Sequence, residues 1–279
     1  MSFCIGKIFR EVTIVTGSSS FIRCRFEECE QTDAGTLVSS GDNVLLVEST
    51  FFYKCSSKTK CGGLKKTDGS LLMKCCEFDE CHGVNGDTRT LGTAMGTSDC
   101  SVKFDDIVFL NCWKQESPYA DNVYGILRGK ADTKNINSTQ CISLKGGLAG
   151  SYDTVEEKAS IRYIQCVQSS DNNAIEVRNV EQIVHYFNII NNTIKSEFIY
   201  INKAKLTVHN GCFFSNTLYN DVGTVELFDC ISDGHPKATK TVEQSSIPFT
   251  DRHCRLSRVF TKRGDQIASR IFTIWLLLG

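Results

Sequence analysis

Proline is nearly absent from this sequence. Only three prolines occur in 279 residues, and the first of them is Pro118. Because proline cannot donate a hydrogen bond to a β-ladder, strands that are paired on both edges exclude it. The proline-free stretch before Pro118 therefore favours strands that are bonded on both sides. The other two prolines, Pro236 and Pro248, lie near the C-terminal end.

Helical periodicity and long apolar runs are missing as well. No segment offers the roughly 10–12 residues of helical apolar periodicity that a helical repeat would need. The apolar run at residues 271–278 has eight residues, whereas a membrane span needs about 20. We expect either a packed apolar end or a membrane anchor that is truncated in this chain, with a basic flank that would support the anchor. The flank consists of Arg258, Lys262, Arg263 and Arg270.

A secretory leader is not evident at the N-terminus. Residues 1–10 have no basic start, no continuous apolar stretch and no small-residue cleavage site. The sequence therefore predicts no signal peptide in this chain.

The net charge of −1 conceals an uneven distribution. Residues 233–270 hold eight Lys and Arg against four Asp and Glu, so the remainder holds 31 − 8 = 23 basic and 32 − 4 = 28 acidic residues. A nucleic-acid interface needs clustered Lys and Arg for phosphate contacts. An acidic body therefore argues against nucleic acid as a partner.

A short motif recurs along the chain at intervals of about 26 residues: an aromatic or apolar residue, two further residues, then Cys or Asn. We take the one interval of 54 residues, from Cys112 to Cys166, as two periods with a degenerate copy at residues 136–141. A fixed period of this size predicts a solenoid whose units stack to form one core. The copies are Phe26–Cys29, Phe52–Cys55, Phe78–Cys81, Phe109–Cys112, Tyr163–Cys166, Ile189–Asn192 and Phe213–Asn216.

Short apolar runs between these copies, such as residues 44–47 and 206–208, are bounded by Gly, Ser, Asn and Asp. Runs of this kind predict strands. Several short strands per unit and no helix predict an all-β parallel β-helix of about eight or nine coils between Val12 and Cys230, with helix at most near the C-terminus. We expect insertion loops at residues 83–97 and 113–122. One inward column is expected to contain Leu37, Leu64, Ala94, Ile126, Leu148, Ile175, Ile199 and Val225.

The Gly-Gly-Leu unit at residues 62–64 and the Phe-x-x-Cys/Asn units resemble those of right-handed parallel β-helix proteins of the pectin-lyase-like superfamily. Within that superfamily they are most similar to polymorphic outer-membrane-protein-like surface repeat proteins. The resemblance covers roughly residues 12–230. It implies a right-handed β-helix, a cell-surface or extracellular location, and binding to glycans or proteins. The chain departs from the family pattern by placing Cys where Asn is usual in five copies.

Fifteen cysteines are present, most of them at one phase of the repeat. Cysteine is among the most buried residue types even as a thiol, so this column is predicted to consist of buried thiols that point inward. Disulfides are the alternative, because equivalent Cα atoms in adjacent coils are close enough to be bridged. The four cysteines that fall off the main phase, Cys61, Cys75, Cys76 and Cys100, are the better disulfide candidates.

Two groups of side chains could support acid–base chemistry or bind Ca²⁺, namely Asp105-Asp106 and residues 171–173 (Asp-Asn-Asn). They lie more than two coils apart, and solvated turn carboxylates are the simpler interpretation. Enzymes of the superfamily also carry Asn-Thr-Asp, Gly-His-Gly and Arg-x-Lys motifs. Only Gly234-His235-Pro236 is comparable, and it does not match.

No metal, cofactor or catalytic set is predicted. The histidines are scattered, and the Cys spacings are explained by the repeat. Two glycosylation sequons begin at Asn137 and Asn191, and they matter only on an extracellular face. The five histidines are His82, His185, His209, His235 and His253.

The sequence thus predicts a β-helix over residues 1–232, a flexible basic tail over 233–270 and a short apolar segment over 271–279. We expect a non-catalytic surface or adhesion module that binds a glycan or protein through its stacked faces and insertion loops. The alternatives are a polysaccharide lyase or glycoside hydrolase on the same scaffold, and a fragment of a larger membrane-anchored surface protein. The sequence identifies neither the ligand nor the oligomeric state.

Overall fold

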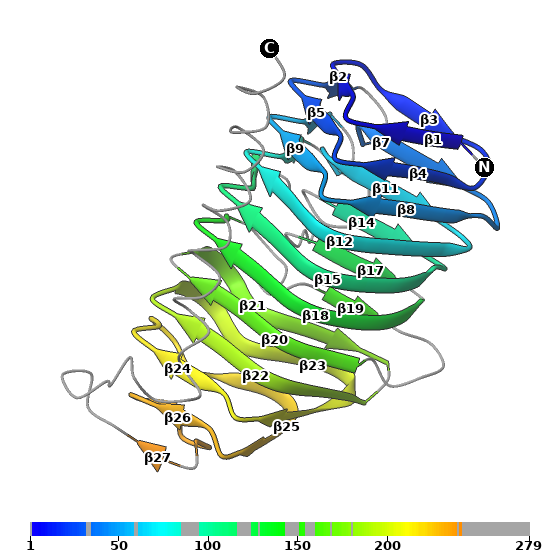
Figure 1. The fold of residues 1–279 in the computed structure, drawn as a ribbon. Coiled ribbons are helices and arrows are strands. Elements are labelled where there is room, and N and C mark those ends of the chain that lie inside the picture. The colour runs from blue at the N-terminus through cyan, green and yellow to red at the C-terminus, as the bar shows by residue number, and fades with distance from the viewer. Residues whose placement is uncertain are drawn as a thin grey trace.

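Parallel β-strands account for all the regular structure that is described. The computed structural model describes residues 2–31, 35–58, 61–84, 95–115, 124–127, 129–142, 151–153, 160–167, 169–179, 181–238 and 240–241. Strands in these ranges lie side by side along the molecule (Figure 1). The expected all-β architecture with parallel pairing is therefore confirmed. Among the same residues, no helix is long and apolar enough to cross a bilayer.

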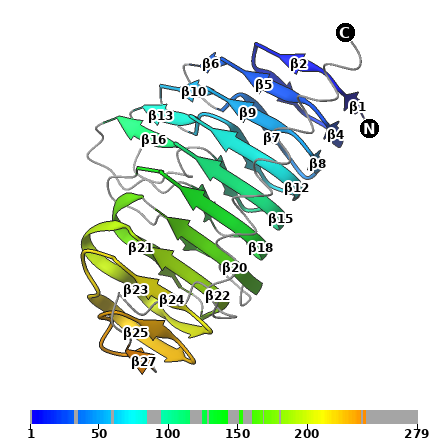
Figure 2. The same cartoon turned by 60° about the vertical axis from the view of Figure 1, so that its left-hand side comes forward.

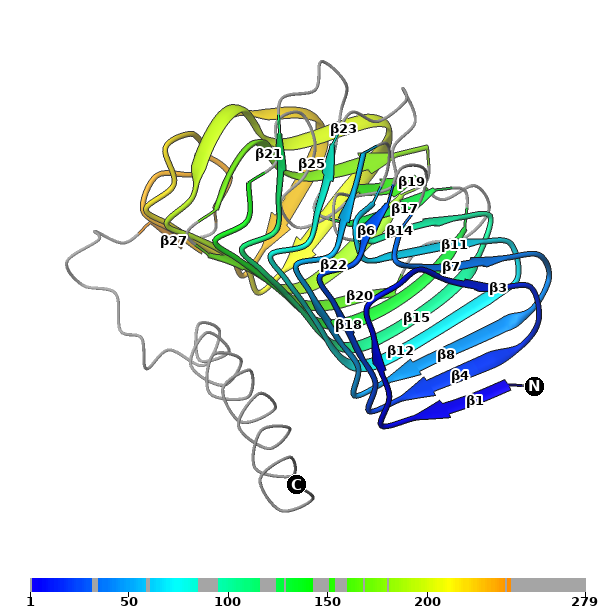
Figure 3. The same ribbon diagram turned by 90° about the horizontal axis from the view of Figure 1, so that it is seen from above.

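The strands form three long ladders, in which each strand pairs with the equivalent strand of the next repeat. Figure 3 shows the first and second ladders on different sides of the molecule. The first ladder contains β3 (Thr13–Val15), β7 (Leu37–Ser40), β11 (Leu64–Thr67), β14 (Met95–Ser98), β17 (Tyr124–Leu127), β19 (Ser151–Asp153), β21 (Ser170–Arg178) and the first half of β23 (Thr193–His209).

The second and third ladders share several long strands. The second contains β1 (Ser2–Ile5), β4 (Ser19–Ile22), β8 (Val44–Glu48), the first halves of β12 (Ser70–Asp79), β15 (Ser101–Leu110), β18 (Lys130–Thr139), β20 (Ser160–Val167) and β22 (Gln182–Ile190), the second half of β23, and β25 (Asp221–Phe228). The third contains β2 (Ile8–Phe9), β5 (Arg25–Glu27), β9 (Phe51–Tyr53), the second halves of the same five long strands, β24 (Cys212–Phe214), β26 (Ile231–Ser232) and β27 (Lys240–Thr241).

A short fourth ladder follows the third in the early repeats and runs along one edge in Figure 2. It contains β6 (Glu30–Gln31), β10 (Ser56–Ser57), β13 (His82–Val84) and β16 (Trp113–Gln115).

Corners between ladders are made by single residues in the left-handed backbone region. Cys75, Asp106 and Asn135 occupy equivalent corners between the second and third ladders, with φ of 52°, 60° and 57°. A non-glycine residue adopts this conformation at a cost of roughly 1–2 kcal/mol. The ladder hydrogen bonds continue through such corners, as where Ser49 N donates to Lys74 O at 2.9 Å. The repeats that carry these three corners therefore turn at the same point, which keeps them in register with their neighbours.

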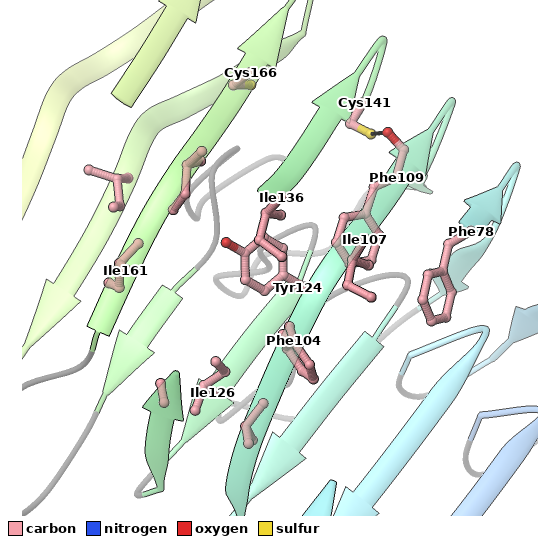
Figure 4. Packing of buried hydrophobic residues seen from close by; sticks show 14 of the residues in the cluster. Phe78, Phe104, Ile107, Phe109, Tyr124, Ile126, Ile136, Cys141, Ile161 and Cys166 are labelled. Atoms are coloured by element: carbon pink, nitrogen blue, oxygen red, sulfur yellow. Dashed lines mark hydrogen bonds between the residues drawn. The ribbon is translucent and has the colours of Figure 1, made fainter. Parts of the chain in front are cut away.

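The core consists of like residues stacked between repeats. In the third ladder, Phe26, Phe52, Phe78 and Phe109 stack with ring centroids 4.9, 4.5 and 5.1 Å apart. The column is completely buried, and Figure 4 shows Phe78 and Phe109 beside Ile107 and other core residues. Stacked aromatic pairs add stability beyond the area they bury. The recurring aromatic motif thus encodes the stack that holds successive repeats together.

The structure corrects one copy of the motif. Cys166 pairs with Ser138 and Ile189, so it occupies the aromatic column and not the cysteine column. The equivalent of Cys141 is Ser169, whose Oγ accepts a hydrogen bond from Cys141 N at 3.0 Å. The expected Tyr163–Cys166 copy is therefore wrong by three residues. The error arose because the interval of 54 residues equals two average periods by coincidence.

The expected inward column is correct in part. Leu37 pairs with Leu64, and Ile175 pairs with Ile199, as predicted. Val225, in contrast, pairs with Leu206 in the second ladder. A register irregularity between β23 and β25 moves the chain from one ladder to the other. Ile126 also lies outside the predicted column. Leu64 pairs with Met95 of β14, and Met95 pairs with Tyr124, so the equivalent of Leu64 in that repeat is Tyr124. Ile126 lies two residues later on the same inward face.

Several expectations fall outside the described residues. These are Ala94 and Leu148 of the inward column, the parts of the insertion loops at 85–94 and 116–122, most of the 233–270 segment, and all of 271–279. Of the basic segment, residues 233–238 lie at the end of the ladders, and β27 pairs with β26.

Candidate functional site

The cysteine column points inward, as the sequence predicts. Cys29, Cys55, Cys81, Cys112 and Cys141 are at most 1% exposed. Their thiols donate to backbone carbonyls of the preceding repeat, as from Cys141 Sγ to Phe109 O at 3.5 Å (Figure 4). Burial, followed by the neighbouring Cys141, raises the pKa of the Cys112 thiol well above its ordinary value. Such thiols are inert in solution, since the thiolate is the reactive form.

The disulfide candidates proposed from the sequence are wrong. Cys61, Cys75, Cys76 and Cys100 are all present as thiols. Two of these thiols donate to backbone carbonyls: Cys76 Sγ donates to Lys74 O at 3.3 Å, and Cys100 Sγ donates to Asp68 O at 3.4 Å. In the described part of the chain, thirteen cysteines are thiols and Cys212 is disulfide-bonded.

The Asp105-Asp106 pair lies at a corner between the second and third ladders. The side-chain amide of Asn135 in the next repeat donates to both carboxylates, at 3.1 Å to Asp105 and 2.8 Å to Asp106. Lys134 Nζ lies 3.6 Å from Asp105 Oδ1, and Cys75 Sγ lies 4.0 Å from Asp106 Oδ2. Both carboxylates are therefore engaged by side chains of adjacent repeats. This arrangement resembles a surface charge ladder more than an acid–base pair.

The second predicted group does not join this pair. Asp171 lies in β21 of the first ladder, where it pairs with Ile194, whereas Asp105 pairs with Lys134 in the second ladder. Asn173, two residues after Asp171, is buried. The two groups therefore do not share a face, because more than two coils and a change of ladder separate them.

A row of outward side chains passes through Asp105, and we call it the corner face. Cross-strand pairing places one residue from each repeat in the row, at the end of the second ladder. Neighbouring rungs lie about 4.8 Å apart. Charges alternate in the first four members, and the last three are basic or aromatic. The corner face consists of Glu48, Lys74, Asp105, Lys134, Arg162, His185 and His209.

The C-terminal part of the corner face combines positive charge with stacked rings. The imidazoles of His185 and His209 stack at 5.0 Å, and His209 stacks on Phe228 at 5.1 Å. Burial lowers the pKa of His185, and the nearby His209 and Arg162 lower it further. His185 therefore stays neutral near pH 7. The Arg162 side chain is 48% exposed and lies 3.6 Å from Asp132.

The repeat interval in the sequence contains a signal for this row, which the motif of aromatic and Cys or Asn residues does not include. His185 and His209 are 24 residues apart, which is one repeat interval. Taken as isolated residues they are scattered, but in the register of the repeat they are direct neighbours.

A buried polar cluster lies at the C-terminal end of the ladders. His235 Nε2 lies 3.1 Å from Asp221 Oδ1, and its other ring nitrogen accepts the Lys237 backbone N–H at 3.2 Å. Ser232 Oγ accepts the backbone N–H groups of Gly234 and His235, at 3.1 and 2.8 Å. His235 is 1% exposed. The cluster therefore packs at the end of the core, where its side chains are engaged with one another and with the backbone. Tyr219 donates to Asp233 in the same cluster.

Metal binding and glycosylation are both restricted by the geometry of the described residues. No group of three or more His, Cys, Asp or Glu side chains among the described residues is placed to hold a metal ion. Asn137 is 2% exposed and accepts from Thr139, which leaves no room for a glycan. Asn191 lies exposed at a corner with φ of 57°. Of the two sequons, only that at Asn191 is accessible in this fold.

Comparisons with known proteins identify no family. No family model matches the chain. No curated protein matches it either. One solved structure, the periplasmic alginate epimerase AlgG, aligns with 8% identity over 78% of each chain. Its TM-score of 0.14 is too low to support any argument about fold or function.

Proposed function

We propose that the chain is a right-handed parallel β-helix of about eight or nine coils that serves as a non-catalytic binding module at a cell surface. Support for the helix comes from strands that pair only in parallel and from corners at equivalent positions in successive repeats. Crossover connections between parallel strands are almost always right-handed. The surface role follows from the resemblance to surface repeat proteins.

The observation that carries the binding proposal is the corner face. It offers two basic side chains, Lys134 and Arg162, followed by the imidazoles of His185 and His209, in consecutive rungs about 4.8 Å apart. Guanidinium groups bind carboxylates and sulfates in two-point geometry. A chain ligand with regularly spaced acidic groups can contact several rungs at once. The ligand class we propose is therefore an acidic glycan or an acidic segment of a protein.

A polysaccharide-cleaving enzyme is the second candidate. It is favoured by one observation, the contact of both Asp105 and Asp106 with the Asn135 amide. Glycosidic hydrolysis needs an acid and a base on opposite sides of the bond. These two carboxylates occupy consecutive positions at one corner, and Lys134 approaches Asp105. The binding module therefore accounts better for the geometry.

Binding can be tested with arrays of sulfated, uronic-acid and neutral glycans and with acidic and neutral peptides. We expect binding to acidic polymers that weakens as salt is raised. The double variant Arg162→Gln/His209→Gln should weaken it at least tenfold. Lys58→Gln is the matched control, because Lys58 is an exposed lysine away from the corner face. Equal loss in the control, or no acidic ligand at all, would contradict the proposal.

A further inference from the structure

The cysteine column holds the thiols of successive repeats in one orientation. Cys29 and Cys55 are rung neighbours, because Ser56 pairs with Glu30 directly after them. The Cys55 thiol donates to the carbonyl of the aromatic residue one rung earlier, Phe26 O, at 3.5 Å. The other members donate to the equivalent carbonyl at 3.4–3.5 Å, namely Cys29 to Phe9, Cys81 to Phe52, Cys112 to Phe78 and Cys141 to Phe109.

A shared acceptor fixes the spacing of the sulfur atoms. Because each thiol is directed at the same carbonyl, neighbouring Sγ atoms follow the rung spacing of about 4.8 Å. A metal–thiolate bond is about 2.3 Å long for zinc, so two such bonds in line span about 4.6 Å. Soft ions such as Cu⁺ bind thiolates and accept two of them in line. An ion of this class therefore fits between two neighbouring members of the column with little movement of either side chain.

A cavity of about 450 Å³ lies beside the first member of the column. It is lined by residues 8–13 of the first repeat. The backbone carbonyls of two lining residues, Phe9 and Glu11, lie 3.5 and 3.8 Å from Cys29 Sγ. The Cys29 thiol therefore lies against the wall of the cavity, which offers an ion an approach to the column.

The surroundings of this first pair favour replacement of the thiol protons by a metal ion. The hydrogen bond with the Cys55 thiol, followed by burial, raises the pKa of Cys29 well above its ordinary value, and the Thr36 hydroxyl opposes this rise. The hydroxyl lies within hydrogen-bonding reach of both sulfur atoms, and Thr36 is itself buried. Thiols of this kind keep their protons unless a metal displaces them. The hydroxyl can then donate to the thiolates that result.

We propose that Cys29 and Cys55 bind one soft metal ion of the Cu⁺ class in line between their sulfur atoms. Two thiols and one Cu⁺ give an S–Cu–S unit and two protons, which pass to water, and no electron is transferred. The unit carries one negative charge, which the Thr36 hydroxyl stabilises. Two ligands complete this geometry, so it does not need the groups of three or more ionisable side chains that are absent among the described residues.

The first experiment measures binding to the reduced full chain in the absence of oxygen. Cu⁺ should pass from a coloured chelator to the protein, and native mass spectrometry should show one copper ion in place of two protons. X-ray absorption at the copper edge should show two sulfur neighbours. Failure of the chelator to lose copper overturns the proposal. Three or more sulfur or nitrogen neighbours around the copper overturn it as well, since the column offers two in line.

The second experiment assigns the ligands. Cys29→Ala should weaken Cu⁺ binding at least a hundredfold and remove the rise in Tm that Cu⁺ gives the unmodified chain. Cys141→Ala is the matched control, because it removes an equally buried thiol several rungs away in the same column and should leave the affinity within twofold. Equal weakening in both variants, or undiminished binding in Cys29→Ala, overturns the assignment to the first pair. The first experiment uses the unmodified chain and does not depend on the folding of either variant.

Discussion

At the scale of the residue, Phe52 shows how one side chain joins two neighbouring repeats. It is completely buried and stacks on Phe26 on one side and on Phe78 on the other. We expect Phe52→Ala to lower the free energy of unfolding by about 3–5 kcal/mol, because the cavity interrupts the aromatic column. Chemical denaturation measures the loss. Phe228→Ala, at a 45% exposed position, should cost far less, and equal losses would contradict the stacking argument.

The buried thiols make a prediction about alkaline pH. Burial raises the pKa of Cys76 from 9.0 to about 12. The Cys76 thiol then binds its proton more tightly in the folded state than in the unfolded state. The stability that this thiol contributes is therefore fully present below pH 9 and is lost as the pH rises toward 12. Thermal unfolding between pH 8 and 11 should show a falling Tm. The decline should be smaller in Cys76→Ala, measured relative to the Tm of that variant at pH 8.

At the scale of the element, the close approach of adjacent repeats is sharpest at Gly62. A Cβ at this position would lie 2.2 Å from Cys55 O and 2.4 Å from His82 O, both of which are backbone atoms. Gly62→Ala should therefore destabilise the fold by about 1–3 kcal/mol or more. Gly17→Ala is the control, since nothing lies within 4 Å of its Cβ position. A neutral effect at Gly62 would mean that the repeats are not packed this closely.

The strands and the parallel pairing could be predicted from the sequence because the motif period is also the structural period. The aromatic column from Phe26 to Phe109 repeats regularly, and stacking of like residues follows directly from that regularity. Cys166 was misplaced because a spacing alone cannot distinguish two average repeats from two unequal ones. The corner face was missed for a related reason: His185 and His209 become neighbours only when the strand register is known.

At the scale of the whole molecule, we expect no polysaccharide-cleaving activity. A lyase or hydrolase needs two ionisable groups with separated pKa values in one cleft. Asp105 and Asp106 share one corner, and Asp221 with His235 is buried at the end of the core. Incubation with acidic and neutral polysaccharides, with and without Ca²⁺, should release no new sugar ends. Release that disappears in Asp105→Ala would instead establish the enzyme.

The ladder hydrogen bonds run along the stack, from each rung to the next, and this orientation determines how the molecule responds to mechanical load. Tension applied to the two ends of the stack acts directly on these bonds, because the described strands pair from each repeat to the next. The terminal rung, held on one side only, should yield first. Under an optical trap, we expect the chain to lengthen in steps of about 90 Å, one repeat of roughly 26 residues at a time.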